Sequence, residues 1–256
     1  MAFQNLSALQ AIAEAGYPSD FVRNAIVSWY YGVYYSASAM LAATDGSVQE
    51  NHQNTANSWD RQVVQNDLIP HPFDLRTSTL VKKECDQEIS NMRQNNHFDL
   101  EQQPDNKEEA LGACLSYLKG TASYERERAE SRVKTFKEFK NLGVDSFRTN
   151  TARTIRDKHL GGKSVCFLHQ AFRFRGKANY RDALYLGYGT EYTSRLEKLL
   201  RDLYAVLAAF LKAASHYCAR RVKQNTWHEF IQDLRVNSRL KHNTGILEHD
   251  VKEGQF

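Results

Sequence analysis

Proline and glycine are scarce in this chain of 256 residues, which contains 4 prolines and 13 glycines. Few positions therefore force a break in a helix, while alanine, leucine, arginine, glutamate and glutamine, which favour helices, are plentiful. No stretch approaches about 18 uninterrupted apolar residues, and the first residues lack the basic and apolar segments of a secretory signal. The composition predicts a mainly helical protein without a membrane span, and we expect a cytoplasmic location.

Cysteine is also sparse, and the cysteines lie far apart in the sequence, at Cys85, Cys114, Cys166 and Cys218. They form no Cys-x-x-Cys pair, and the nine histidines include no His-Glu-x-x-His pattern. We therefore expect reduced thiols. Neither a disulfide framework, a metal site nor a cofactor is predicted.

The charge of the chain is unevenly distributed. The net charge is +4, yet residues 1–60 contain one basic residue and five acidic ones. Residues 148–181 contain Asp157 as their one acidic residue and nine basic ones: Arg148, Arg153, Arg156, Lys158, Lys163, Arg173, Arg175, Lys177 and Arg181. Phenylalanine and tyrosine side chains are interleaved with them. A surface that contacts phosphates and stacks on bases needs these residue types at this density.

Six of these residues are candidate RNA-binding residues: Lys158, Lys163, Arg173, Arg175, Lys177 and Arg181. Two alternatives stay open, because a run of charge reports electrostatics and not a partner. The segment could be a basic face that contacts only solvent, or it could pair with the acidic N-terminal segment.

Apolar spacing predicts two helices that are too apolar to stand alone. Residues 21–44 carry apolar or aromatic groups on most of their circumference, and Asp45-Gly46 is expected to end this helix. A second helix, from about residue 190 to 223, carries an apolar stripe over residues 192–214 that includes Val206. We expect the two helices to pack side by side in one bundle.

Other helices are expected near residues 55–66, over about 107–140 with a break near Gly120 left open, and over 227–234. Residues 88–106 are rich in asparagine and glutamine, which predicts a long connection. No series of strands is predicted.

Two segments resemble HEPN domains. Residues 29–41, WYYGVYYSASAML, followed by Gly46 and by His52 ahead of Trp59, are similar to the aromatic second helix and following loop of that family. Residues 175–186, RGKANYRDALYL, resemble the stretch before the last long HEPN helix, with matches at Arg175, Ala178, Asn179 and Tyr180.

The resemblance implies an all-α fold, a HEPN-like up-and-down helical bundle with a large, mainly helical insertion. Residues 1–75 and 165–225 would form the two halves of the bundle, 76–164 the insertion, and 226–256 a C-terminal helix and tail. We expect Asn179 and Tyr180 to cap and pack the last helix. Core or dimer packing is expected of the tyrosines in the aromatic helix: Tyr30, Tyr31, Tyr34 and Tyr35.

Catalytic HEPN ribonucleases carry an arginine separated from a histidine by four to six residues. The resemblance implies a metal-independent mechanism, in which the histidine exchanges protons with the ribose 2′-hydroxyl or the leaving oxygen and the arginine stabilises the charged phosphorane. Arg153, Arg156 and His159 fit this pattern and are the candidate catalytic residues. One version of the motif has a second histidine, which would fall at Gly162.

Three alternatives to this catalytic set remain. The pairs Arg221 with His228 and Arg235 with His242 have similar spacing. The set at residues 153–159 could equally be a helix turn that holds solvated charges.

The sequence thus favours a HEPN-like protein of a toxin–antitoxin or anti-phage defence system that binds RNA, with metal-independent endoribonuclease activity as a further hypothesis. We expect the protein to form a homodimer and to bind an antitoxin or effector protein. We expect no interaction with a membrane. The alternative is a catalytically silent HEPN partner that docks a nucleotidyltransferase, a nuclease or another effector, which the missing second histidine and the insertion favour. A helical nucleic-acid-binding regulator outside the HEPN family is a third hypothesis.

Overall fold

A computed structural model describes residues 1–15, 17–48, 50–94, 96–100, 104–180 and 190–237, with only the backbone of residues 18, 19, 179, 180, 190–195 and 237. These residues form an all-α protein without a strand. The helices are α1 (Ala2–Ala13), α2 (Val22–Asp45), α3 (His52–Gln62), α4 (Lys82–Arg93), α5 (Lys107–Val133), α6 (Lys137–Lys140), α7 (Asn150–Gly161), α8 (Phe167–Tyr180), α9 (Thr190–Ala219) and α10 (Gln224–Asn237), with 3₁₀ turns η1 (Pro18–Phe21) and η2 (Val64–Asn66).

The chain divides into two compact units. Unit 1 consists of Met1–Ile69 and Ala171–Phe256, and unit 2 of Pro70–Gln170. Unit 2 is therefore inserted into unit 1, with its second boundary inside α8. The insertion predicted from the sequence, residues 76–164, lies within unit 2.

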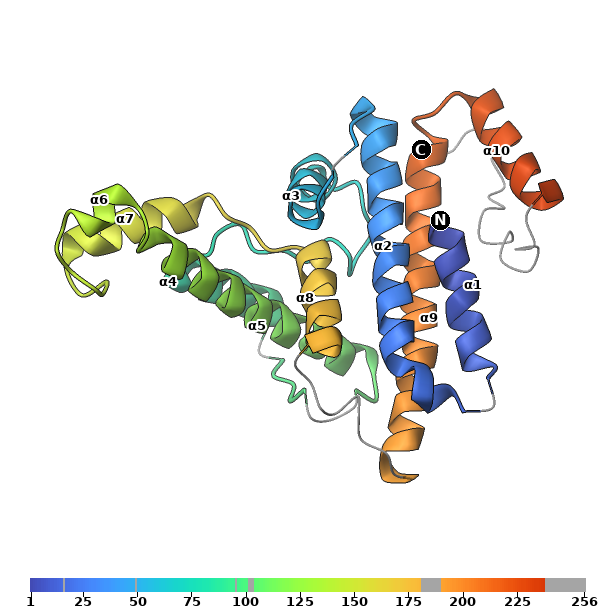
Figure 1. Ribbon diagram of the computed structural model, residues 1–256, viewed down its shortest axis with the longest axis horizontal. Helices are drawn as coiled ribbons and strands as arrows, with labels where there is room; N and C mark the ends of the chain where they lie inside the picture. The colour runs from blue at the N-terminus through green and yellow to red at the C-terminus, as the bar shows by residue number, and fades with distance from the viewer. Residues whose placement is uncertain (16, 49, 95, 101–103, 181–189, 238–256) are drawn as a thin grey trace. The chain divides into compact units, whose positions relative to one another are not determined.

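In unit 1, α1, α2 and α9 lie side by side (Figure 1). The interface between α2 and α9 is apolar, because Ile26, Val33 and Met40 of α2 and Leu207 and Phe210 of α9 are fully buried. The expected packing of these two helices, predicted over residues 21–44 and 190–223, against each other is confirmed. Burial of side chains of this size is the main favourable contribution to the stability of such a bundle.

Local sequence sets the ends of the helices that position the site described below. Gly46 has φ +74, a left-handed conformation that glycine adopts without a steric penalty, and it ends α2 as predicted. The side chain of Asn51 accepts a hydrogen bond from the backbone N–H of Asn54 at 2.8 Å and caps the N-terminus of α3. His52 is consequently the first residue of α3, held at a fixed place beside α2.

Unit 2 is organised around α5. Its larger core contains Leu115 and Leu118 of α5, Cys85 and Ile89 of α4, and Leu160 of α7. A smaller core lies near the other end, around Val133, Phe139 and Ala152. Thr77 and Val165 exchange backbone hydrogen bonds of 2.9 and 3.2 Å. The start and the end of the unit 2 chain are thereby joined to each other.

Three expectations about the helices need correction, and the alternative left open at Gly120 is resolved. The segment 88–106 is not all connection, because α4 continues to Arg93. The long helix ends at Val133 and not near 140, since Phe136 is the N-cap of the separate α6, and it is unbroken at Gly120. Val206, placed on the buried stripe of α9, is 37% exposed.

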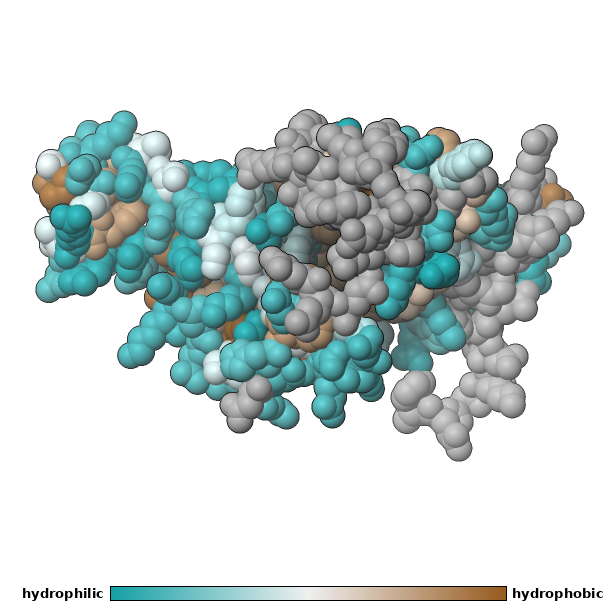
Figure 2. Space-filling model, turned by 90° about the horizontal axis from the view of Figure 1, so that it is seen from below, coloured by the Kyte–Doolittle hydropathy of each residue, from teal (hydrophilic) through white to brown (hydrophobic). Residues whose placement is uncertain are grey.

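The coloured part of the face shown in Figure 2 is mostly hydrophilic. It includes some hydrophobic surface over the end of unit 2 that holds α6 and α7. Partly buried hydrophobic residues pack against the smaller core of unit 2, among them Leu142, Val144 and Ile155. Among the described helices, none has the length and apolar character needed to cross a membrane.

Candidate functional site

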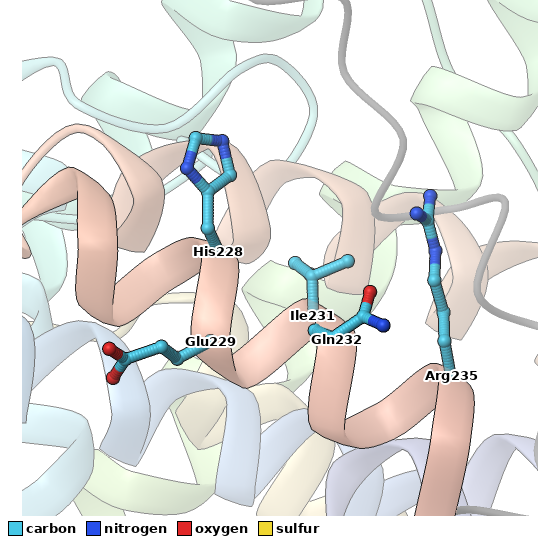
Figure 3. A pocket seen from close by; sticks show the side chains of 5 residues that line it. All are labelled: His228, Glu229, Ile231, Gln232 and Arg235. Atoms are coloured by element: carbon cyan, nitrogen blue, oxygen red, sulfur yellow. The ribbon is translucent and has the colours of Figure 1, made fainter.

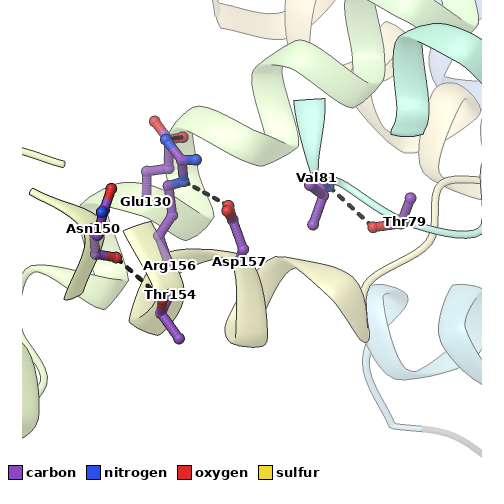
Figure 4. Close-up of polar contacts among 7 residues, drawn as sticks. All are labelled: Thr79, Val81, Glu130, Asn150, Thr154, Arg156 and Asp157. Carbon is purple, nitrogen blue, oxygen red and sulfur yellow. Dashed lines mark hydrogen bonds and ion pairs between the residues drawn. The ribbon is translucent and has the colours of Figure 1, made fainter. Parts of the chain in front are cut away.

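The three predicted catalytic residues lie on α7, in unit 2. The guanidinium of Arg156 is held by Asp157, whose Oδ1 is 2.8 Å from Nε, and by Glu130, whose Oε1 is 3.9 Å from Nη1 (Figure 4). It also lies over the ring of Phe147, 5.5 Å from the ring centroid. These carboxylates raise the pKa of Arg156, with the hydrogen bond to Asp157 as the largest cause. Arg156 is thus engaged in contacts within unit 2.

The other two residues of this set have different surroundings. Arg153 is exposed, and its Nη2 donates to Oδ1 of Asn150 at 2.6 Å. His159 is half-buried, with its ring edge-on to Phe136 at a centroid distance of 5.0 Å. Burial lowers the pKa of His159, and the charge of Lys163 lowers it further. Its Nε2 is buried without a hydrogen-bond partner in the described part of the chain. No contact joins the three side chains to one another in the described residues.

The predicted RNA-binding residues divide between the two units. Lys158 is exposed and Lys163 half-buried, both in unit 2, whereas Arg173, Arg175 and Lys177 are half-buried residues of α8 in unit 1. Arg181 lies outside the described residues, as do the side chains of Asn179 and Tyr180. The part of α8 in unit 1 lies against α2, where Nε of Arg23 donates to the carbonyl of Ala178 at 3.2 Å.

The strongest concentration of polar and aromatic groups in unit 1 is a group of side chains from α2, α3 and α8. We call it the Arg175 cluster; its members are Tyr30, Tyr31, Tyr34, His52, Phe172 and Arg175. At its centre, the hydroxyl of Tyr30 is 2.7 Å from Nδ1 of His52. The His52 ring stacks on Phe172 at 5.4 Å with an interplanar angle of 27°, and it meets Tyr34 edge-on at 4.5 Å.

Arg175 is enclosed by the same rings. The carbon at the centre of its guanidinium lies 4.8 Å from the ring centroid of Tyr30, 5.1 Å from that of Phe172 and 5.8 Å from that of Tyr31. A cation over aromatic faces is attracted by the negative charge of those faces. Nη1 donates to the Tyr31 hydroxyl at 3.4 Å, and Nε is buried with no acceptor among the described residues.

Burial and the nearby positive charge determine the protonation states in the cluster. Tyr30 is 2% exposed, and burial raises its pKa far above the usual value even though Arg175 opposes the shift. Burial lowers the pKa of His52, and the charge of Arg175 lowers it further. At neutral pH the phenol of Tyr30 is therefore protonated and the imidazole of His52 is neutral. The guanidinium of Arg175 is the cation of the cluster. Among the described residues, no carboxylate pairs with that cation.

Sequence reasoning identified most members of this cluster without joining them. Arg175 was predicted as an RNA-binding residue, the tyrosines as packing residues, and His52 as a feature of the resemblance. The packing expectation fits the buried Tyr30, whereas Tyr31 and Tyr34 are half-buried around His52. A signal that could have joined them is Asn51, because asparagine favours helix N-caps and here places His52 at the start of α3.

A further hollow, of about 490 Å³, lies along α10, lined by His228, Glu229, Ile231, Gln232 and Arg235 (Figure 3). His228 and Arg235 belong to two different alternative arginine–histidine pairs, and here they project from the same side of one helix. Both are exposed. Arg221 instead lies over the ring of Tyr217, with 3.6 Å to the centroid, and His242 is outside the described residues.

Cys85, Cys166 and Cys218 are buried, and Cys114 is exposed. None is in a disulfide, and Sγ of Cys166 is 3.2 Å from Nδ1 of His169. That nitrogen also lies 3.2 Å from the backbone nitrogen of Cys166, whose N–H it accepts, and both residues are buried. The contact therefore stabilises the start of α8. Because both residues are buried, neither side chain is accessible to a substrate. The described residues contain no group of three histidine, cysteine or acidic side chains that could hold a metal ion.

No protein-family model, no curated protein and no solved structure matches the chain. The geometry of the Arg175 cluster is therefore the main guide to function.

Proposed function

We propose that this protein is a HEPN-like RNA-binding protein of a toxin–antitoxin or anti-phage defence system, and that unit 1 contacts the RNA through α8. The two segments that resemble HEPN domains support this proposal, since residues 29–41 lie on α2 and the described part of the second segment, residues 175–180, lies on α8, and these helices supply most of the Arg175 cluster. The all-helical architecture is also compatible with it.

The observation that carries the proposal is the state of Arg175. It is a cation without a carboxylate partner in the described residues, placed among aromatic rings on a helix that has no acidic residue. Arg173 and Lys177 flank it on α8. A basic side chain such as Arg175, which has no carboxylate partner in the described residues and lies next to aromatic rings, suits a partner that combines phosphates with bases, and RNA is such a partner.

A second candidate function is favoured by the contacts of Arg156. An arginine that stabilises a phosphorane needs a free guanidinium edge, whereas Arg156 is held by Asp157 and Glu130. These contacts support the alternative of a catalytically silent HEPN partner, which docks a nucleotidyltransferase, a nuclease or another effector. Homodimer formation remains part of the proposal, because the family resemblance implies paired subunits; sedimentation of the full chain tests it.

A charge-reversal experiment tests RNA binding. The variant with Arg173→Glu, Arg175→Glu and Lys177→Glu should lose binding to a fluorescently labelled single-stranded oligouridine at low salt, measured by anisotropy. A matched control carries Lys82→Glu, Lys83→Glu and Lys107→Glu, three exposed positions in unit 2 with the same change of charge. The control should retain binding. Absence of binding by the wild type, or equal loss in both variants, would contradict a role of α8.

A further inference from the structure

We infer that the Arg175 cluster is a phosphate-binding site, in which the guanidinium of Arg175 and the imidazole of His52 hold one phosphate group. The inference rests on the proposed function for its main source of ligand, the backbone of an RNA strand. A free phosphate monoester, such as a nucleotide, carries the same group and is the second source.

Arg175 is prepared for such a ligand before the ligand arrives. The rings of Tyr30, Tyr31 and Phe172 cover its faces and fix its position, so little conformational freedom is lost on binding. Its edge carries the donors, and the buried Nε has no acceptor in the described residues. A buried donor without an acceptor is unfavourable, and a phosphate oxygen would satisfy it. The planar edge of a guanidinium matches two oxygens of a phosphate.

The hydrogen bond between Tyr30 and His52 decides which nitrogen of His52 carries the proton. Tyr30 is buried, and in the described residues its hydroxyl contacts no acceptor other than Nδ1 of His52. The hydroxyl therefore donates and Nδ1 accepts, because the opposite arrangement would leave the hydroxyl proton without an acceptor. In the neutral imidazole the proton is then on Nε2, which becomes a second donor for the phosphate.

The same hydrogen bond argues against proton transfer by His52. A neutral imidazole that already carries its proton on Nε2 and accepts a hydrogen bond at Nδ1 has no free basic nitrogen. To act as an acid, it would have to form an anion or draw a proton from Tyr30, which burial keeps protonated. The groups that contact the ring are Tyr30, Tyr31, Tyr34 and Phe172, and none is acidic. The cluster thus binds a phosphate without cleaving it.

Nuclear magnetic resonance of the His52 side chain tests this site directly. The full chain, labelled with ¹⁵N-histidine, is titrated with inorganic phosphate and separately with oligouridine at constant ionic strength. We expect Nδ1 to be unprotonated and Nε2 protonated in the free protein, and each probe to shift the His52 signals in a saturable manner. Arg175→Lys should weaken phosphate binding at least about tenfold, because it keeps the charge but loses the planar edge. Arg61→Lys, at an exposed position of α3 in the same unit, is the matched control and should change it less than about twofold.

Substitutions of His52 distinguish the contribution of its N–H donor to phosphate binding from the contribution of its ring shape. His52→Phe keeps an aromatic ring but removes the donor, so it should weaken phosphate binding, whereas His52→Gln restores an N–H donor and should recover part of the affinity. With these variants, binding is followed by ³¹P line broadening of inorganic phosphate, and folding by thermal denaturation.

The outcomes distinguish this inference from the proposed function. RNA binding without any shift of the His52 signals, or phosphate binding unchanged in Arg175→Lys, would overturn the phosphate site and leave RNA binding by α8 in place. A response to inorganic phosphate without a response to RNA would support the site, assign its ligand to free phosphate monoesters and contradict the proposed function.

Discussion

Gly32 of α2 faces Leu207 of α9 so closely that a Cβ atom at residue 32 would lie 2.5 Å from Cδ2 of Leu207. The same Cβ would lie 2.7 Å from Cδ1 and 3.2 Å from Cγ, so the whole end of the leucine side chain is in the way. Leu207 is fully buried, so any shift of its side chain would have to take place inside a packed core. The absence of a side chain at residue 32 therefore sets how closely the two main helices of unit 1 approach each other.

Gly32→Ala should lower the free energy of unfolding by about 1–3 kcal/mol, the usual cost of overpacking a core. Chemical denaturation followed by circular dichroism measures the change. Gly161→Ala is the control, since a Cβ at the end of α7 meets nothing within 4 Å. A Gly32→Ala protein as stable as the wild type would mean that α2 and α9 are not in such close contact.

RNA affinity should fall as the salt concentration rises, and the steepness of that fall reports the number of phosphate contacts. For single-stranded nucleic acid, each contact contributes about −0.7 to the slope of log affinity against log salt concentration. Lys177→Gln should therefore reduce the magnitude of the slope by roughly 0.7. The exposed Lys83 lies in unit 2, and Lys83→Gln should leave the slope unchanged. Anisotropy titrations over a range of salt concentrations provide both slopes.

The wild type should bind oligouridine without cleaving it, because Asp157 and Glu130 hold the guanidinium of Arg156. The assay analyses RNA incubated with the full chain in excess EDTA. Products that end in 2′,3′-cyclic phosphate would contradict this expectation. In that case, a loss of about 10²–10⁴ in rate on His159→Ala would identify the α7 set as catalytic, whereas loss on His228→Ala would move the site to α10.

Stability should decrease as the pH falls below about 6.5, the pKa of an unperturbed histidine. Burial lowers the pKa values of His52, His159 and His216 in the folded protein. The unfolded chain therefore binds these protons first, and protonation favours unfolding. Above the unfolded pKa, this contribution to stability is fully present.

The pH dependence of the free energy of unfolding should be weaker in a His159→Asn variant, which has one fewer histidine with a lowered pKa. Urea denaturation at a series of pH values between about 7.5 and 5.5 gives the free energy of unfolding at each pH. Identical pH dependence in the wild type and the variant would show that His159 titrates normally in the folded protein.

Sequence patterns predicted the elements with a clear apolar period and missed those without one. The helices α2 and α9 were predicted because long runs of apolar residues recur at helical spacing. The end of α4 was missed, since only Cys85 and Ile89 of that polar helix are buried. The end of α5 was misplaced because Phe136 continues the apolar spacing, although it caps α6 and packs against His159.

The candidate site could be predicted only in parts. The contact between Tyr31 and Arg175 joins residues 144 positions apart, and local spacing carries no information on such a distance. Basic residues close together in the sequence were taken as one surface, yet Lys163 and Arg173 belong to different units. The contact of Arg156 with its sequence neighbour Asp157 is local, whereas its contact with Glu130 is a tertiary one, as is the environment that gives Arg175 no carboxylate partner among the described residues.

The insertion of unit 2 into unit 1 also affects the order in which the protein is made. On the ribosome, residues 1–69 emerge before unit 2, and the whole of unit 2 follows before the partner helix of α2 is synthesised. During this interval the apolar faces of α1 and α2 have no α9 to cover them, which is the condition in which nascent chains aggregate or recruit chaperones. Unit 2 has no such delay, because its sequence is continuous and Thr77 pairs with Val165 at its two ends. Translation speed through residues 70–170 thus sets how long the first half of unit 1 stays exposed.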